Sequence, residues 1–174
     1  SCDTWNTEFT MLDPYRGLNA NMHTVEAFLA AADVTGEEKY RVRAGRIIDH
    51  VLVWAKDNNW RIPEHFSSDW VPDLECNKDH PADPFKPYGA TPGHGIEWAR
   101  LITQWALSTY KGDKNGAAPY REAAENLYFA THCKTANSGL EDQIRSFMKE
   151  HPNSGLIIID TLKRVREVGG ADFS

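Results

Sequence analysis

A cluster of prolines sets the strongest limit on how this 174-residue chain can fold. Five of them lie between Asn58 and Pro92. Proline has no backbone N–H and clashes with the preceding helical turn, so this stretch cannot form a continuous helix. We expect a long loop here, with a short β-hairpin around residues 64–73. A loop this long inside a compact domain is often functional.

Helical periodicity marks the sequence on both sides of this loop. Apolar residues recur three and four positions apart, which is typical of an amphipathic helix. The expected helices cover residues 21–33, 37–57, 93–110 and 119–133. The last begins at Pro119, because proline is favoured in a first helical turn. The short link at Thr35 and Gly36 predicts that the first two helices form a hairpin. Most of the chain is therefore expected to be all-α.

The sequence changes in character after Lys134. Residues 156–160, Leu-Ile-Ile-Ile-Asp, have the pattern of a short buried strand that ends in an acidic residue. A helical architecture offers no parallel sheet to such a strand. We therefore expect one domain over residues 1–135 and an unrelated, α/β-like tail over residues 136–174.

Composition and charge exclude several classes of protein. Hydrophobic residues make up 41% and charged residues 25%, as in a soluble globular domain. The net charge of −6, without a run of Lys or Arg, argues against nucleic acid or a membrane surface as a partner. No apolar stretch approaches the roughly 20 residues that cross a bilayer. The first residues lack a signal-peptide pattern, and three scattered cysteines predict neither disulfides nor a zinc site, so we expect a cytoplasmic protein.

Two copies of a His-x-x-Glu pattern stand at the starts of expected helices. His23 and Glu26 form the first copy, and His94 and Glu97 the second. A spacing of three places imidazole and carboxylate on one helix face. A carboxylate can fix the tautomer of a neighbouring histidine and strengthen it as a base. We expect both histidines at the same end of neighbouring parallel helices, facing a shared cavity, although each pattern alone also fits a solvated surface pair.

The residues around these histidines resemble a known family. The similarity lies in residues 19–23, Asn-Ala-Asn-Met-His, and in residues 85–98, Phe-Lys-Pro-Tyr-Gly-Ala-Thr-Pro-Gly-His-Gly-Ile-Glu-Trp. Both are similar to motifs of the N-acylglucosamine 2-epimerase superfamily, and most of all to its mannose or sulfoquinovose aldose–ketose isomerases. The resemblance covers about residues 14–133. It implies an (α/α)6 barrel with its active site at the barrel mouth and no cofactor, of which this chain holds a part.

The resemblance also implies roles for individual residues. His94 matches an acid/base histidine of the family, Glu97 matches its partner, and His23 matches a residue that contacts the sugar and is the second candidate catalytic histidine. The other candidates for substrate binding are Asn19, Lys86, Tyr88 and Trp98. Lys86 stands where the family usually has arginine, and lysine cannot make a bidentate contact with an anionic sugar. Another catalytic histidine of the family comes later in the sequence than anything matched here.

The chemistry expected of these residues is metal-free acid–base catalysis. A histidine with a pKa near 6.5 can remove the C2 proton of an open-chain aldose at neutral pH and leave an enediolate. Return of the proton to C1 gives the ketose, and its return to the opposite face of C2 gives the epimer. We therefore expect part of a sugar isomerase or 2-epimerase with a monosaccharide substrate. Helix faces meant for absent neighbours predict self-association.

Other interpretations concern the tail and the chain as a whole. Residues 138–174 resemble a fragment of a RecA-like P-loop ATPase, in which Asp160 ends the strand of the second nucleotide motif. The phosphate-binding motif G-x-x-x-x-G-K-[ST] is absent from the sequence, so we expect no ATPase activity. Two alternatives for the whole chain stay open. One is a metal-binding helical protein, although di-metal bundles use the reverse order, Glu-x-x-His. The other is a non-catalytic helical remnant.

Overall fold

Two helical hairpins dominate the computed structural model, which describes residues 4–131 and residue 149. The helices are α1 (Asn19–Thr35), α2 (Glu38–Asp57), α3 (Pro92–Tyr110) and α4 (Lys114–Ala130). The helices α1 and α2 pack together as one hairpin, and α3 and α4 as the other. The expected all-α character is thus confirmed. The expected strand at 156–160 and the tail at 136–174 lie outside the described residues, apart from residue 149.

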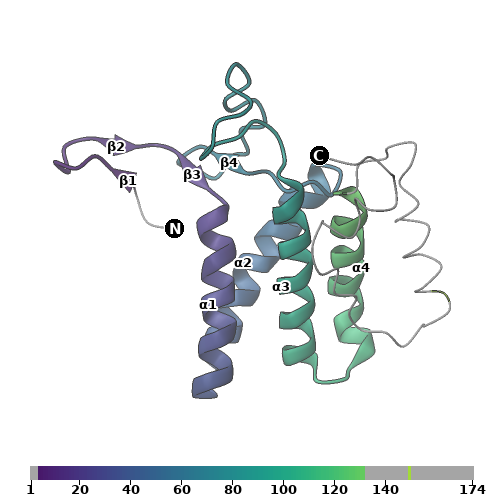
Figure 1. Cartoon of the computed structure of the whole chain (residues 1–174). Coiled ribbons are helices and arrows are strands. Elements are labelled where there is room, and N and C mark those ends of the chain that lie inside the picture. Colours follow the sequence, from purple (N-terminus) through teal and green to yellow (C-terminus); the bar gives the residue numbers. More distant parts are fainter. Residues whose placement is uncertain (1–3, 132–148, 150–174) are drawn as a thin grey trace, which may run out of the picture. The chain divides into compact units, whose positions relative to one another are not determined.

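The direction of the helices brings the starts of α1 and α3 to one end of this part of the chain. Both helices begin beside the long loop and run away from it, whereas α2 and α4 run back toward it (Figure 1). The core forms between the four helices, where the apolar positions of the sequence pattern meet. Its largest buried side chains include Met22, Val25, Ile48, Val51, Trp98, Leu101, Ile102 and Leu127.

Local signals set most helix ends. Gly36 follows α1 in the left-handed conformation, with φ of 71°, and its N–H donates to the carbonyl of Ala32. Glycine adopts this conformation without the steric cost that other residues meet, which explains the break expected there. Pro92 occupies the first turn of α3, one residue before the predicted start.

The predicted start of the fourth helix is wrong by five residues. The helix begins at Lys114, because the carboxylate of Asp113 accepts hydrogen bonds from the backbone N–H groups of Asn115 and Gly116. Such a cap satisfies N–H groups that have no partner within the helix. Pro119 therefore lies inside α4 rather than in its first turn.

Short strands lie in the N-terminal segment, and one of them pairs with the long loop. Strand β1 (Thr4–Trp5) pairs with β2 (Leu12–Asp13), and β3 (Arg16–Gly17), just before α1, pairs with β4 (His65–Phe66) in the long loop. A short hairpin is present at residues 64–73 as expected, with an antiparallel bridge between Phe66 and Pro72 and backbone hydrogen bonds from Asp73 to His65 and from Ser67 to Val71. Of the helices in the described part, none has the length and apolar character needed to span a bilayer.

Candidate active site

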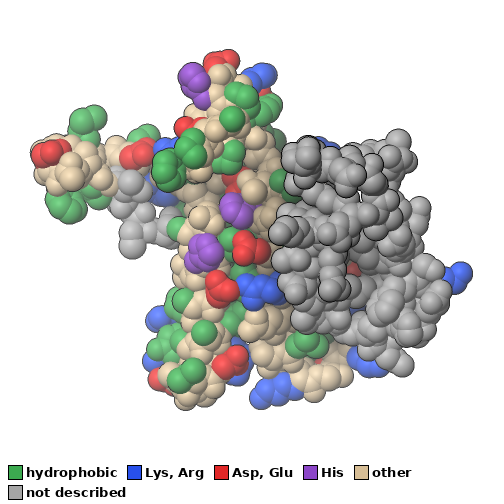
Figure 2. Space-filling model, viewed as in Figure 1, with side chains coloured by type: hydrophobic (Ala, Val, Ile, Leu, Met, Phe, Trp, Pro, Cys, Tyr) green, Lys and Arg blue, Asp and Glu red, His purple; other side chains and the backbone are tan. Residues whose placement is uncertain are grey.

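The two candidate histidines lie near the starts of α1 and α3. Because these helices begin at the same end and contact each other, the expectation of neighbouring parallel helices is confirmed (Figure 1). Figure 2 shows histidine, acidic and basic side chains gathered over the loop-proximal halves of these two helices. The exposure of the two rings differs. The side chain of His23 is 57% exposed and that of His94 is 26% exposed.

His94 pairs with a residue that the sequence patterns did not single out. Its Nδ1 lies 2.8 Å from Oε2 of Glu64, in the long loop. The other oxygen of Glu64 accepts a hydrogen bond from the backbone N–H of Thr91 at 3.1 Å. Glu97, the expected partner, acts on His94 through its charge, whereas the oxygen that accepts the hydrogen bond belongs to Glu64. The expected pairing of His94 with Glu97 is therefore corrected: the long loop, not the same helix, supplies the carboxylate.

Glu64 changes the acid–base behaviour of His94. The hydrogen bond to Glu64 raises the pKa of His94 above its ordinary value of 6.5, and the charges of Glu64 and Glu97 act in the same direction. Partial burial opposes this rise, because it disfavours the charged ring. His94 therefore keeps its proton to a higher pH than a free histidine does. Once deprotonated, it is the stronger base.

The first histidine pattern behaves as the sequence predicts. Nδ1 of His23 lies 3.3 Å from Oε2 of Glu26, one turn further along α1. Arg100 of α3 donates from Nη2 to Oε1 of Glu26 at 2.7 Å. These hydrogen bonds, first from Arg100 and then from His23, lower the pKa of Glu26. The three side chains link α1 to α3, but each is about half exposed, so the link is screened by solvent.

A partly buried hydrogen-bond relay fixes the long loop beside this site. The hydroxyl of Tyr15 lies 2.9 Å from Nδ1 of His65, and Nε2 of His65 lies 2.7 Å from the carbonyl oxygen of Pro87. Because a carbonyl only accepts, Nε2 carries the proton of a neutral His65 ring and the tyrosine donates to Nδ1. Burial is the main cause that raises the pKa of Tyr15 to about 12. This relay holds both ends of the loop against the segment before α1.

The predicted substrate-binding residues fall into different environments. Asn19 is exposed at the first position of α1. Lys86 is 40% exposed, with Nζ 3.9 Å from the centre of the Tyr15 ring. Tyr88 is 38% exposed in the loop. Trp98 differs, since it is only 1% exposed and belongs to the core between the helices. Its expected contact with substrate is therefore replaced by a packing role.

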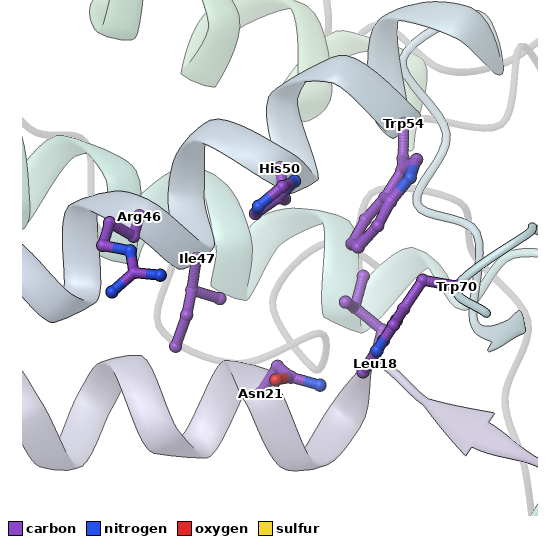
Figure 3. Close-up of a pocket in the computed structure, with 7 residues that line it drawn as sticks. All are labelled: Leu18, Asn21, Arg46, Ile47, His50, Trp54 and Trp70. Atoms are coloured by element: carbon purple, nitrogen blue, oxygen red, sulfur yellow. The ribbon is translucent and has the colours of Figure 1, made fainter. Parts of the chain in front are cut away.

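A groove opens between α1 and α2 at the loop end. It has a volume of about 470 Å³ and is lined by Leu18, Asn21, Arg46, Ile47, His50, Trp54 and Trp70. Figure 3 shows Leu18 and Asn21 facing the side chains of α2, with Trp70 of the loop beside Trp54. The two indole rings stack 5.6 Å apart. Neither candidate histidine lines this groove, so a cavity shared by the histidines stays a prediction.

Glu64 is the residue that sequence reasoning missed. It lies in the run Ile-Pro-Glu-His-Phe at residues 62–66, in which every residue is buried. A carboxylate within such an apolar and aromatic run is the one available signal, because buried charges require a partner. The partner, His94, lies 30 residues further along, so no local periodicity connects the two.

Comparisons with known proteins show to which family the chain belongs. The chain matches the N-acylglucosamine 2-epimerase (GlcNAc 2-epimerase) family over residues 1–153. It belongs to this family. The resemblance drawn from the two histidine motifs is thus confirmed, whereas these matches do not bear out the resemblance of residues 138–174 to a P-loop ATPase.

Proteins similar to this member of the epimerase family include several D-mannose isomerases. The one from Thermobifida fusca is 49% identical over 102 residues, which are 58% of this chain and 25% of that protein. The one from Pseudomonas cannabina pv. alisalensis is 39% identical over 133 residues, 76% of this chain and 32% of that protein. This chain thus spans about a third or less of the length of these relatives.

A solved structure supports the fold. A crystal structure of a D-mannose isomerase superposes with a TM-score of 0.62 at 32% identity, and the match covers 73% of this chain and 32% of that chain. The helices described here therefore form part of an α/α barrel.

Within the residues that the structure describes, no three His, Cys, Asp or Glu side chains converge in a way that could hold a metal ion.

Proposed function

We propose that this chain supplies part of the active site of a sugar aldose–ketose isomerase or 2-epimerase, with a mannose-like monosaccharide as substrate. The observation that carries the proposal is the pairing of His94 with the buried carboxylate of Glu64 at the start of α3. A histidine held in this way is oriented by the carboxylate, and the side chain of His94 stays 26% exposed. The kinship with D-mannose isomerases supports an aldose as the substrate.

The proposed reaction begins with His94 as the base. Its unprotonated ring takes the C2 proton of the open-chain aldose, and the electrons of that bond form the C1–C2 double bond of an enediolate. The electrons of the former C1 carbonyl pass to O1, and the hydroxyl proton of O2 is transferred to O1. His94 returns the C2 proton to C1, and C2 with its oxygen O2 becomes the carbonyl of the ketose. Epimerisation instead requires a proton donor on the opposite face of C2. The route uses proton transfers alone, so it needs no metal and no cofactor.

His23 and Asn19 are proposed to bind the sugar rather than to move the C2 proton. Both lie near the start of α1, the helix that contacts α3, and both are exposed. The link from His23 through Glu26 to Arg100 holds His23 beside α3. Glu97 is proposed to act on His94 through its charge, and Lys86 and Tyr88 of the long loop to contact the sugar from the loop side.

A chimera tests this proposal. The 102 residues that match the Thermobifida fusca enzyme would replace the corresponding segment of that protein. We expect the chimera to convert mannose to fructose, and His94→Ala to abolish the conversion. The matched control is His80→Ala, a substitution of an exposed loop histidine, which should leave turnover unchanged. A folded chimera that is inactive, or one that stays active with His94→Ala, would contradict the proposed function.

A further inference from the structure

We propose that Glu64 is the positioning residue of His94, and that it makes Nε2 of His94 the atom that takes and returns the substrate's proton. This inference rests on the function proposed above. It assigns a role to a residue of the long loop that lies outside both histidine motifs.

The two oxygens of Glu64 accept hydrogen bonds from different partners, and this difference leads to the assignment. Oε1 accepts from the backbone N–H of Thr91 at 3.1 Å, and Oε2 lies 2.8 Å from Nδ1 of His94. An ionised carboxylate has no proton to donate, so Nδ1 of His94 must carry one. A neutral imidazole has a single N–H. Its other nitrogen, Nε2, therefore holds the free lone pair, as a general base requires.

The surroundings of Glu64 hold this carboxylate in place before any substrate arrives. Its side chain is only 5% exposed. Its backbone carbonyl accepts from the N–H of Leu18, at the start of α1, at 3.0 Å. The next residue, His65, belongs to β4 and pairs with Gly17 of β3. Glu64 thus contacts the starts of both α1 and α3, and the His94 ring cannot rotate away without leaving a buried carboxylate short of a donor.

The same loop contains a histidine with the opposite arrangement. Nε2 of His65 lies 2.7 Å from the carbonyl of Pro87, so the neutral ring carries its proton on Nε2. The two rings therefore carry their protons on opposite nitrogens. Glu64 places the proton of His94 on Nδ1, and the carbonyl of Pro87 places the proton of His65 on Nε2. His65 serves as an internal reference for a measurement on His94.

Nitrogen-15 NMR of the whole 174-residue chain tests the assignment. Two-bond proton–nitrogen correlations distinguish a ring protonated on Nδ1 from one protonated on Nε2, and His94→Gln and His65→Gln identify the two sets of signals. Above its pKa, His94 should carry its proton on Nδ1, while His65 carries it on Nε2. A wild-type His94 protonated on Nε2 would overturn the proposal without recourse to any variant.

The variant Glu64→Gln provides the second test. Its amide oxygen can still accept from Thr91, which turns the NH₂ group toward His94 and forces Nδ1 to accept. We therefore expect His94 to switch to the Nε2–H tautomer and its pKa to fall. Glu75→Gln is the matched control, the same change at an exposed position of the same loop, and should alter neither. An unchanged His94 tautomer in a folded Glu64→Gln protein would refute the role of Glu64.

Activity gives a readout that separates this inference from the proposed function. In the active chimera, Glu64→Gln should lower kcat by roughly 10- to 100-fold, as the loss of a residue that orients a catalytic histidine does, and should change KM little. If Glu64→Gln lowers kcat/KM by the same factor only because KM rises, with kcat unchanged, Glu64 does not position His94. If the NMR results hold and no sugar is turned over, the proposed function fails and the tautomer assignment stands.

Discussion

At the scale of single residues, the chain contains the same pair of groups in two environments. His23 and Glu26 lie 3.3 Å apart, with 57% and 49% of their side chains exposed. His94 and Glu64 lie 2.8 Å apart, with 26% and 5% exposed. Water competes with the first pair and is largely excluded from the carboxylate of the second. The second pair should therefore contribute more to stability, although its residues are 30 positions apart in sequence.

Double-mutant cycles would measure this difference. The interaction free energy between His94 and Glu64, from His94→Gln, Glu64→Gln and the double variant, should be about 1.5–3 kcal/mol at pH 5.5, the range for hydrogen bonds to charged groups. The same cycle on His23 and Glu26 should give no more than about 0.5 kcal/mol. Urea denaturation provides the free energies of unfolding.

The pH dependence of the first cycle follows from the direction of the shift. The pKa of His94 is higher in the folded chain than the 6.5 of a free histidine. Its contribution is therefore fully present below about pH 6.5 and is lost as the pH rises through the folded-state pKa. The interaction energy should be smaller at pH 9 than at pH 5.5. A value that is equal at both pH values, or larger at pH 9, would show that the charged form of His94 is not the one Glu64 stabilises.

At the scale of elements, the sequence predicts the helices well and the contacts between them poorly. Periodicity and Gly36 place the end of α1 within two residues, because both signals are local. The start of α4 differs from the prediction because the side chain of Asp113 accepts hydrogen bonds from N–H groups in the first turn of the helix. This cap is a stronger signal for a helix start than Pro119. The pairing of β3 with β4, and with it the approach of Glu64 to His94, depends on tertiary packing, which no local pattern specifies.

The close approach of α2 to α3 offers a test of that packing. A Cβ at Gly45 would lie 2.5 Å from Cζ2 of Trp105. Trp105 has little freedom to move, since its Nε1–H donates to the carbonyl of Arg41 at 2.9 Å and its ring contacts Tyr120. We expect Gly45→Ala to destabilise the chain by about 1–3 kcal/mol, because the cost of overpacking exceeds the gain in helix propensity.

Gly93→Ala is the matched control for this substitution. A Cβ at Gly93, in the first turn of α3, would meet nothing within 4 Å. The same change should therefore leave stability unchanged or raise it by up to about 1 kcal/mol. Urea denaturation of both variants makes the comparison. If Gly45→Ala proves as stable as Gly93→Ala, Trp105 can move aside and the contact does not limit the approach of the helices.

At the scale of the whole molecule, the chain spans about a third or less of the relatives it matches. The four helices that the structure describes form only part of an α/α barrel. Among the described residues, large apolar side chains are exposed, including Phe9, Met11 and Leu12 near the first two strands. Apolar surface of this kind favours association between chains. We expect the purified chain to self-associate, which analytical ultracentrifugation over a range of concentrations would detect as a rising mean mass.

The same incompleteness predicts that this 174-residue chain has little or no isomerase activity by itself. We expect a partial barrel to leave the site open to water, so that the ordered environment around His94 and the developing enediolate is lost. By family resemblance, a second proton-transfer histidine lies beyond the matched part, and its absence alone costs roughly 100- to 10,000-fold in rate. Incubation of the purified chain with mannose, followed by detection of fructose, measures this directly. Turnover at the level of the active chimera, abolished by His94→Ala, would instead mean that these helices, alone or through self-association, complete the site.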